Sequence, residues 1–320
     1  MFHKIGYMHT IDIHTHGIGG CDSSGKDAKT ILKAAEIYCS YGVDAIVFAV
    51  YSAPVHIMRE DMAAVKHAMD IQKAFVQKQK TSSSIIGVHL EGPFLNPVRC
   101  GALDPHSFLK PDIKQFEELI DGFEDIVKII TIAPELDGSK KIIKKVRDRG
   151  IKISMGHSDA TYAEAEAGYN AGAECITHIF NAMRGIQHRE PGIAGFGLLH
   201  ADIYTEVIAD PYHLHPEIIK MIFRVKNPRR IIIISDSIKD TKHSRSSGET
   251  QNMNGGKNLK TTPSQTAHIL RGGSMTILEA TQRLVDMGID YKTVRRCITE
   301  NPAKYLGICK KNLIENSERK

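Results

Sequence analysis

Two histidines, His14 and His16, stand one residue apart in the stretch IDIHTHGIGG, directly after a short apolar run. Side chains two positions apart on a strand point to the same face, so a strand that begins at residues 10–13 would bring both imidazoles into one small volume. Imidazole is the commonest metal-ligating side chain, and two of them supply half of a four-ligand shell. The alternative is a pair of polar residues hydrogen-bonded to backbone or water.

Four more side chains that can bind a metal follow other apolar runs. Glu91 lies in HLEGPF, His157 in GHSDA, His178 in THIFNAM and Asp236 in SDS. Any one of them alone is more often structural, and Asp236 alone could be a capping residue. Six such side chains at one edge of a sheet predict a mono- or dinuclear site of imidazole and carboxylate ligands, which suits Zn, Fe(II), Mn or Co.

Such a site predicts metal-assisted hydrolysis. A divalent ion lowers the pKa of bound water and polarises a carbonyl oxygen. We see no thiolate ligand set and no nucleophilic triad in the sequence. Asp236 is therefore predicted to be a metal ligand and also the general base, and then the general acid, of the reaction.

Eight β-branched runs, each followed by a helix-like stretch, are predicted to position these residues. Near-continuously apolar strands alternating with helices indicate a parallel sheet covered by helices. Eight of them favour an α/β fold of the (β/α)8 TIM barrel type, whose active site lies at the carboxyl ends of the strands. An open doubly wound sheet is the alternative. The predicted strands are 10–13, 45–50, 86–90, 128–133, 151–155, 174–177, 205–209 and 231–235.

Local signals also predict helix ends. Residues 27–42 have the pattern of an amphipathic helix that ends at Gly42. Ser158 is predicted to be the N-cap of the alanine-rich helix that follows it. Residues 240–272 are rich in Ser, Thr, Gly and Asn with little periodicity, which is typical of a functional loop or an insertion. We expect residues 1–320 to form a single catalytic domain that carries this polar insertion.

The composition of the chain limits the class of protein to which it can belong and the class of substrate that it can bind. With 320 residues, of which 42% are hydrophobic, the chain can bury a large core. A net charge of +5 is compatible with an anionic small-molecule substrate and gives no sign of nucleic-acid binding. No apolar run reaches the ~18–20 residues that span a bilayer, and the first residues lack the apolar core of a signal peptide. Six widely spaced cysteines suit free thiols in the cytoplasm.

Several motifs together carry a family resemblance. They are HLEGPFLNPVRCGA, TIAPE, GHSDATYAEAEAGYNAGAECITHIFNAM, REPG, IADPYHLHPE and NPAKYLG. Over residues 10–307 the sequence resembles the N-acetylglucosamine-6-phosphate deacetylase branch of the amidohydrolase superfamily. This resemblance implies a (β/α)8 barrel that holds one or two divalent ions. It also implies hydrolysis of the acetamide of N-acetylglucosamine-6-phosphate to glucosamine-6-phosphate and acetate.

The resemblance also implies residue roles. Glu91, His157 and His178 match the principal metal ligands, and the HxH pair matches members with a second metal. Asp236 matches the acid/base, and Arg189 matches the arginine that binds the phosphate. The predicted strand at 128–133 leads into the residues APE and offers no lysine that could be carbamylated to bridge two metals. Glu91 is therefore expected to be the carboxylate shared by the metal ions. The implied substrate-binding positions are Ala102, Asn181, Ala182, Arg189, His213, Leu270, Arg271 and Gly272.

The sequence also departs from the family pattern. Members usually carry a small β-sandwich built from both chain ends, and this sequence lacks most of those segments. We therefore expect either a homodimer that covers the exposed barrel surface or a tendency to aggregate. Leu103 stands where a substrate-contacting histidine is expected, and His106 is the candidate replacement.

Three functions follow from these observations. The first is hydrolysis of an N-acetylated amino-sugar 6-phosphate. The second keeps the metal but acts on another N-acyl sugar or an N-acyl amino acid, and Leu103 is its best support. The third is a degenerate barrel that binds a sugar phosphate or a metal without turnover. The presence of Asp236 counts against the third, because binding alone does not need an acid/base.

Overall fold

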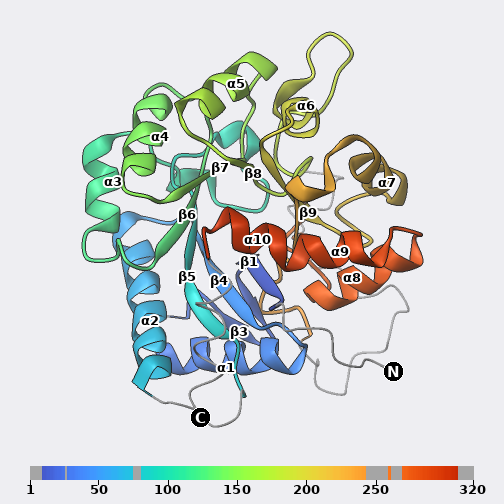
Figure 1. Cartoon of the computed structure of the whole chain (residues 1–320). Helices are drawn as coiled ribbons and strands as arrows, with labels where there is room; N and C mark the ends of the chain where they lie inside the picture. The colour runs from blue at the N-terminus through green and yellow to red at the C-terminus, as the bar shows by residue number, and fades with distance from the viewer. Residues whose placement is uncertain (1–8, 26, 75–80, 243–258, 261–268, 309–320) are drawn as a thin grey trace.

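The computed structural model describes residues 9–25, 27–74, 81–242, 259–260 and 269–308. A parallel sheet of eight strands lies at the centre, with helices around it (Figure 1), and its strand order follows the chain. The predicted (β/α)8 barrel is confirmed, and all eight predicted runs form strands. The strands are β1 (Ile11–Thr15), β4 (Ala45–Tyr51), β5 (Ser84–Glu91), β6 (Val127–Ile132), β7 (Lys152–Met155), β8 (Cys175–Ile176), β9 (Tyr204–Ile208) and β10 (Ile231–Ile234).

The helices cover the outside of the sheet and one end of the barrel. In α10 the Tyr305 ring lies 5.3 Å from the ring of Tyr204 at the start of β9, so α10 covers the amino-terminal ends of the strands (Figure 1). The carboxyl ends open on the opposite side. The helices are α1 (Ala28–Ser40), α2 (Val55–Ala74), α3 (Ile113–Ile120), α4 (Ser139–Asp148), α5 (Tyr162–Ala171), α6 (Gly192–Leu199), α7 (Pro216–Val225), α8 (Ile277–Asp286), α9 (Tyr291–Ile298) and α10 (Glu300–Tyr305).

The first and last strands of the barrel meet at the carboxyl-terminal edge. The backbone N–H of Asp236 donates to the carbonyl of His14 (3.0 Å), and the N–H of His16 donates to the carbonyl of Ser237 (2.8 Å). These bonds join the segment just after β10 to the end of β1. The seam therefore brings the HxH pair and Asp236 together.

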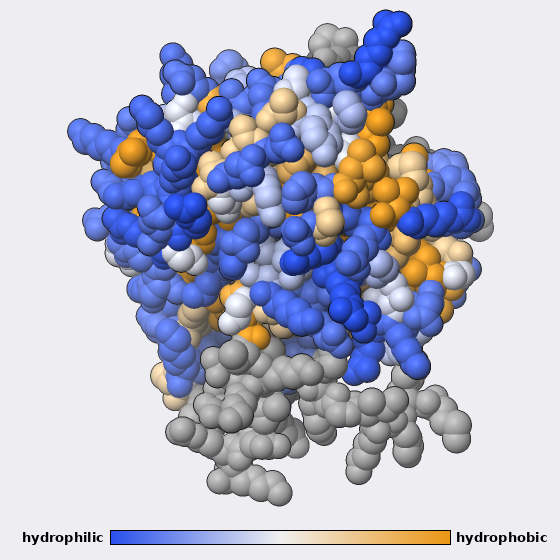
Figure 2. Space-filling model, turned by 45° about the horizontal axis from the view of Figure 1, so that its top comes forward, coloured by the Kyte–Doolittle hydropathy of each residue, from blue (hydrophilic) through white to orange (hydrophobic). Residues whose placement is uncertain are grey.

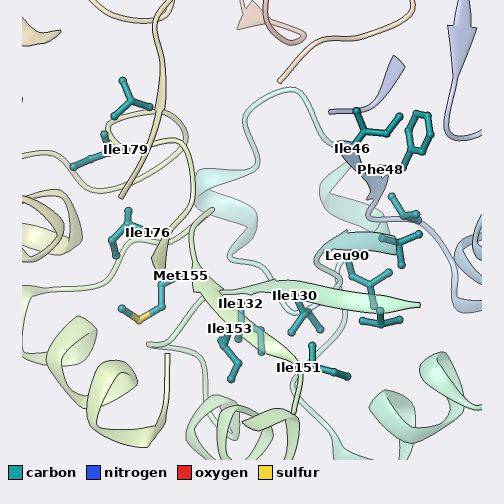
Figure 3. Close-up of a cluster of buried hydrophobic side chains, with 14 of the residues drawn as sticks. Ile46, Phe48, Leu90, Ile130, Ile132, Ile151, Ile153, Met155, Ile176 and Ile179 are labelled. Atoms are coloured by element: carbon teal, nitrogen blue, oxygen red, sulfur yellow. The ribbon is translucent and has the colours of Figure 1, made fainter. Parts of the chain in front are cut away.

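Two apolar layers hold the barrel, one on each face of the sheet. Alternate strand residues such as Phe48, Leu90 and Ile132 point outward and pack under the helices (Figure 3). The inward-facing residues between them form a separate cluster with Tyr305 inside the barrel. That cluster contains Ile11, Ile13, Ala45, Val47, Ile129, Cys175, Tyr204, Ile208, Ile232, Ile234 and Tyr305. The floor of the barrel is thus a packed core, and the polar side chains lie above it.

An irregularity in β1 places the histidines. The pairing of β1 with β4 shifts register between Asp12 and Thr15. In strict alternation Ile11 and His14 would point to opposite faces. Because of the shift, Ile11 and Ile13 join the inner cluster while His14 and His16 also lie buried in the barrel.

The start of α5 corrects one prediction. The N-cap is Thr161, which forms a capping box with Glu164, so the prediction of Ser158 as the cap was wrong. Ser158 instead connects the loop after β7 to two neighbouring loops. Its hydroxyl donates to Glu135 (2.7 Å), and its N–H donates to the carbonyl of Ala182 (3.2 Å). The prediction that the first long helix ends near Gly42 is confirmed, since α1 ends at Ser40 and Gly42 has φ +78°.

The remaining segments are short or lie on the surface. Two small antiparallel pairs join β2 (Gly17–Ile18) to β3 (Cys21–Asp22) and β11 (Leu259–Lys260) to β12 (Ile269–Leu270). The second pair belongs to the predicted polar insertion, of which residues 243–258 and 261–268 lie outside the described part. The face of the molecule in Figure 2 is mostly hydrophilic. None of the described helices is both long and apolar enough to cross a membrane.

Candidate functional site

Six predicted side chains meet at the carboxyl-terminal mouth of the barrel. They come from five different strand ends, and none exposes more than 9% of its surface. Parallel strands of a closed barrel deliver their ends to one mouth, which is why residues far apart in the sequence converge. The six are His14, His16, Glu91, His157, His178 and Asp236.

Glu91 lies at the centre of this group. Its Oε1 is 3.0 Å from Nε2 of His157 and 3.2 Å from Nε2 of His178. On the other side its Oε2 is 3.4 Å from Nε2 of His16, and Oε1 is 3.6 Å from Nε2 of His14. Glu91 thus belongs to two sets of possible ligands, one with His157 and His178 and one with the HxH pair.

The contact between the imidazole of His157 and Glu91 indicates that a proton or a cation belongs between them. Nδ1 of His157 donates to the carbonyl of Arg99 (3.0 Å), and its Nε2 faces Oε1 of Glu91 at 3.0 Å. Two acceptors at 3.0 Å repel unless a proton or a cation lies between them. A divalent ion that takes both atoms as ligands resolves this conflict.

The HxH pair lies in a strongly anionic environment. Burial lowers the pKa of His14, but its hydrogen bond with Glu206 and the charges of Asp236 and Glu91 outweigh burial and raise that pKa to about 10. Burial of His16 is likewise outweighed by Asp236 and Glu91, which raise its pKa to about 9. Burial raises the pKa of Glu91, but its hydrogen bonds with His157, His16 and His178 outweigh burial and hold that pKa well below its usual range. The mouth therefore attracts positive charge.

Some buried nitrogen atoms in the site have no hydrogen-bond partner within the described residues. They include Nε2 of His14, which faces both Glu91 and Asp236 at 3.6 Å. An orphaned, buried nitrogen that faces two carboxylates is a suitable metal ligand. The residues present therefore fit a divalent cation, and a nitrogen–oxygen donor set without sulfur suits Zn, Fe, Mn or Co.

Asp236 lies on the seam between β10 and β1. Its Oδ1 is 3.4 Å from Nε2 of His16 and 3.6 Å from Nε2 of His14. Burial raises the pKa of Asp236, but these two imidazoles outweigh burial and lower it, so the carboxylate is ionised. The N–H of Gly273 donates to the carbonyl of Asp236 (2.6 Å) and fixes this turn.

Backbone strain gathers at this mouth. Six described residues other than glycine have positive φ, and five of them follow the ends of β7, β8 and β10. Such conformations cost about 1–3 kcal/mol each and persist where the surrounding structure enforces them, commonly at functional sites. The five are His157 (φ +46°), His178 (φ +28°), Phe180 (φ +73°), Ala182 (φ +48°) and Asp236 (φ +47°).

The structure brings several predicted substrate positions beside the six candidate ligands. Asn181 and Ala182 lie three and four residues after His178, and Nδ2 of Asn181 donates to the carbonyl of His178 (3.2 Å). Ala102 is half-buried on the loop after β5. Its neighbour Gly101 packs so closely on the other loop that a Cβ there would lie 3.2 Å from Cβ of Ala182.

The positions Leu270, Arg271 and Gly272 run from β12 to the seam. Leu270 belongs to β12, and Arg271 is exposed. Gly272 packs against the seam, where a Cβ would lie 2.8 Å from the carbonyl oxygen of Asp236. This segment therefore lies next to the candidate acid/base.

His213 and Arg189 differ in their surroundings. The side chain of His213 is almost fully buried, and its Nδ1 donates to Oδ2 of Asp210 (2.9 Å). Burial lowers the pKa of His213, but the contact with Asp210 outweighs burial and raises it. Asp210 also accepts from the N–H of Ser274 (2.9 Å), which anchors the segment after Gly272. Arg189 is exposed on a turn, and its guanidinium forms no ion pair with a described residue.

His106, the candidate replacement for the histidine expected at position 103, does not lie beside the candidate metal ligands. Leu103 is half-buried, and His106 is exposed in a short 3₁₀ turn (Pro105–Ser107), where its N–H donates to Asp104 (3.0 Å). No contact of His106 with the six ligands is found among the described residues. Its substitution for the expected histidine stays a prediction.

Sequence reasoning missed four residues around the site. Glu206 and His89 lie beneath the ligands, Tyr51 stacks on His16 with ring centroids 3.8 Å apart, and Asp210 orients His213. A signal did exist for Glu206 and His89, because a charged or polar residue in the middle of an apolar strand run must face something polar.

Comparisons with known proteins agree with this geometry. The model of the amidohydrolase family matches residues 10–316. An N-acetylglucosamine-6-phosphate deacetylase from Vibrio furnissii is 32% identical over 231 residues, which cover 72% of this chain and 56% of that protein. The chain thus spans little more than half the length of this relative. An N-acetylgalactosamine-6-phosphate deacetylase from Escherichia coli O157:H7 is 28% identical over 304 residues, 93% of this chain and 77% of that protein.

A solved structure extends the likeness to three dimensions. It is a mutant N-acetyl-D-glucosamine-6-phosphate deacetylase from Mycobacterium smegmatis in complex with N-acetyl-D-glucosamine-6-phosphate. The two chains share 26% sequence identity with a TM-score of 0.82, and the alignment covers 94% of this chain and 77% of the other. The similarity therefore covers the barrel and its mouth.

Proposed function

The chain belongs to the amidohydrolase family, and on this premise we propose that it hydrolyses the acetamide of N-acetylglucosamine-6-phosphate to glucosamine-6-phosphate and acetate. The observation that carries the proposal is the arrangement of Glu91 among imidazoles at the barrel mouth, with Asp236 beside them. The relatives named as amino-sugar-phosphate deacetylases support the choice of substrate.

The metal ligands in this proposal are His14, His16, Glu91, His157, His178 and Asp236, which would hold one or two divalent ions of Zn, Fe, Mn or Co. When bound, such an ion lowers the pKa of water toward ~7 and polarises the amide carbonyl. Burial of the whole group keeps bulk water from screening these charges.

Asp236 moves the proton in this mechanism. It is ionised and buried, so it can accept a proton from the attacking water. It then donates that proton to the amine nitrogen as the bond between the carbonyl carbon and this nitrogen breaks. Acetate and the amino sugar leave with all atoms accounted for.

The remaining residues bind and orient the sugar phosphate. His213, held by Asp210, would contact the substrate near its carbonyl and sugar ring. The strained loop after β8 would present Asn181 and Ala182, and Ala102 and the run Leu270, Arg271 and Gly272 would line the other sides. Arg189 would bind the phosphate, since a guanidinium stays charged and offers two parallel donors.

A second candidate keeps the same chemistry and changes the sugar. Leu103 departs from the expected histidine, and the Escherichia coli relative is named for the galactosamine epimer of the substrate. Another N-acyl sugar, or an N-acyl amino acid, is therefore the alternative. A barrel that binds without turnover is disfavoured by the presence of Asp236.

One assay separates these functions. Metal-loaded protein is given N-acetylglucosamine-6-phosphate, N-acetylgalactosamine-6-phosphate or N-acetylglucosamine, and acetate release is measured with and without a chelator. We expect the fastest release from N-acetylglucosamine-6-phosphate and a loss of activity with the chelator. Faster turnover of the galactosamine compound would favour the alternative, and full activity without metal would overturn the mechanism.

Arg189 gives the assay a test of phosphate recognition. Charge-assisted hydrogen bonds contribute about 1.5–3 kcal/mol each, so Arg189→Ala should lower kcat/KM for the phosphorylated sugar by roughly 10- to 150-fold. Any slow activity on N-acetylglucosamine should barely change. Equal losses on both sugars would mean that Arg189 supports the fold rather than the phosphate.

Assembly and location are further parts of the proposal. We propose a cytoplasmic homodimer with a small-molecule substrate and no nucleic-acid or membrane partner. Free thiols at Cys21, Cys100, Cys175 and Cys297 support a reducing compartment. Exposed apolar side chains such as Leu199 (62%) and Val225 (48%) offer surface for a partner copy. Light scattering at several concentrations tests the dimer, and a thermally robust monomer would contradict it.

A further inference from the structure

A buried carboxylate lies one layer beneath the candidate metal site. Glu206 projects from β9 into the barrel and is fully buried. Its Oε2 is 3.2 Å from Nδ1 of His14 and also accepts from the backbone N–H of His178 (3.4 Å), while Oε1 has no partner among the described residues. One carboxylate thus touches two candidate ligands from opposite parts of the site.

The neighbouring imidazole of His89 does not compete for this role. Its Nδ1 donates to the carbonyl of Ile13 (3.3 Å), and its Nε2 accepts from the hydroxyl of Thr131 (2.7 Å), which is bonded in turn to Thr177 (2.9 Å). With both nitrogen atoms used, His89 has no lone pair left for a cation. The group of His14, His89 and Glu206 is therefore a support for the site above it rather than a second metal site.

Glu206 has no Lys or Arg partner among the described residues, and its one ion-pair partner there is His14. A buried carboxylate without a permanent cation is unfavourable for folding. Its position is explained if its benefit is the orientation of His14. A metal-ligating histidine commonly donates its other ring N–H to a carboxylate, which fixes the tautomer and makes the free nitrogen a better ligand.

We propose that Glu206 is a positioning residue for the metal centre. By accepting the Nδ1–H of His14, it directs the lone pair of Nε2 toward the space between Glu91 and Asp236. By accepting the N–H of His178, it also ties the strained turn after β8 to the same carboxylate. This inference rests on the proposed metal centre and is independent of which sugar is the substrate.

The test compares Glu206→Ala and Glu206→Gln with Asp61→Asn. Asp61 is a nearly fully buried carboxylate too, but it lies on α2, outside the barrel. Zn²⁺ affinity of metal-stripped protein is measured by competition with a chelating indicator, and thermal unfolding is measured with and without Zn²⁺. We expect Glu206→Ala to bind Zn²⁺ about 10- to 100-fold more weakly, and Glu206→Gln less so, because an amide oxygen can still accept from Nδ1–H.

Two further readouts separate positioning from simple structural support. The increase in unfolding temperature that Zn²⁺ gives should be smaller in Glu206→Gln than in wild type. In Zn²⁺-loaded protein the ¹⁵N signals of His14, assigned with His14→Gln, should show a protonated Nδ1 and a metal-bound Nε2 in wild type, and a mixture of states in Glu206→Ala.

The outcomes have distinct meanings. Unchanged Zn²⁺ affinity in Glu206→Ala, or equal losses in Asp61→Asn, would overturn the role of Glu206 while leaving the proposed function intact. A lower unfolding temperature of the metal-stripped variants without any change in the ¹⁵N signals of His14 would do the same. Wild-type protein that binds no Zn²⁺, Fe²⁺, Mn²⁺ or Co²⁺ would overturn the proposed function and this inference with it.

Discussion

The two halves of the candidate site are built differently. In the half made by Glu91, His157 and His178, which we call the tight half, the nitrogen–oxygen distances are 3.0 and 3.2 Å. In the half made by His14, His16 and Asp236, which we call the loose half, the corresponding distances are 3.4 and 3.6 Å. The tight half stands on strained turns after β7 and β8, and the loose half stands on the seam between β1 and β10.

The imidazole rings of the two halves are also held by different kinds of contact. His157 is held by backbone: its Nδ1 donates to the carbonyl of Arg99, and its own carbonyl accepts from the N–H of Asn96 (2.9 Å). The HxH pair is held by side chains, with Glu206 on His14 and Tyr51 stacked on His16. The nitrogen and oxygen atoms of the tight half also lie closer together than those of the loose half. We therefore expect the tight half to bind an ion more strongly.

The largest expected effect comes from Glu91, which belongs to the tight half and also contacts both imidazoles of the loose half. Glu91→Gln removes the carboxylate charge between the two halves, so metal content should fall below one ion per chain and acetate release should fall to the level of metal-stripped protein. Elemental analysis and the acetate assay measure both. His16→Ala is the matched control, because it should leave the ion of the tight half in place. Normal metal content in Glu91→Gln would remove the basis for treating the halves as linked.

Asp236 should separate binding from chemistry. Asp236→Asn keeps the shape of the side chain but cannot accept the proton, so kcat should fall by ~10²–10⁴, the usual scale for a positioned acid/base. The tight half should still hold its ion, because Asp236 is not among its ligands. Metal analysis and steady-state kinetics on the same sample decide the matter. A variant that turns over normally would assign the proton transfer to another residue.

Protons should compete with the ion in the loose half. With pKa values of about 10 for His14 and about 9 for His16, both imidazoles are charged near neutral pH before an ion binds. An ion must displace these protons, so affinity should rise with pH up to about 10, by as much as ~10-fold per pH unit for each proton released, with the His16 contribution ending near pH 9. Calorimetry in two buffers of different ionisation enthalpy counts the protons. Binding of a second ion without proton release would contradict these roles.

The smallest effect should come from Tyr51. Its ring lies parallel to that of His16, with an interplanar angle of 7°. Aromatic pairs contribute about 0.5–1.5 kcal/mol beyond burial, so Tyr51→Leu should weaken the loose half by roughly 2- to 10-fold and leave the tight half unchanged. Tyr169→Leu is the control, since Tyr169 packs on His200 outside the barrel at 4.2 Å. Equal effects of the two variants on metal affinity would rule out a role for the stack.

Much of the barrel, and the convergence of the candidate ligands at its mouth, could be predicted from the sequence. Parallel strands buried on both faces read as apolar runs, and the first polar residue after each run lies at the mouth. This rule located Glu91, His157, His178 and Asp236 without any contact information. The HxH pair was located by its spacing.

The support around these ligands could not be predicted in the same way. Ile11 and His14 both point into the barrel because the pairing of β1 shifts register between Asp12 and Thr15. Strict alternation of side chains along the strand would have placed them on opposite faces. The cap of α5 lies three residues after the predicted Ser158, because Thr161 finds Glu164 at capping-box spacing while Ser158 bonds to a distant loop. Glu206 acts on His14 across 192 positions of sequence, which only the closed ring brings together.

The seam between β1 and β10 also sets an order in time. The ring starts at β1 and cannot close until β10 has been made, more than two hundred residues later. Chains emerge from the ribosome from the N-terminus, and domains gain their contacts as the later segments arrive. Glu91, His157 and His178 have all been synthesised before Asp236. The residues of the tight half are therefore all present in the nascent chain before the segment that completes the loose half.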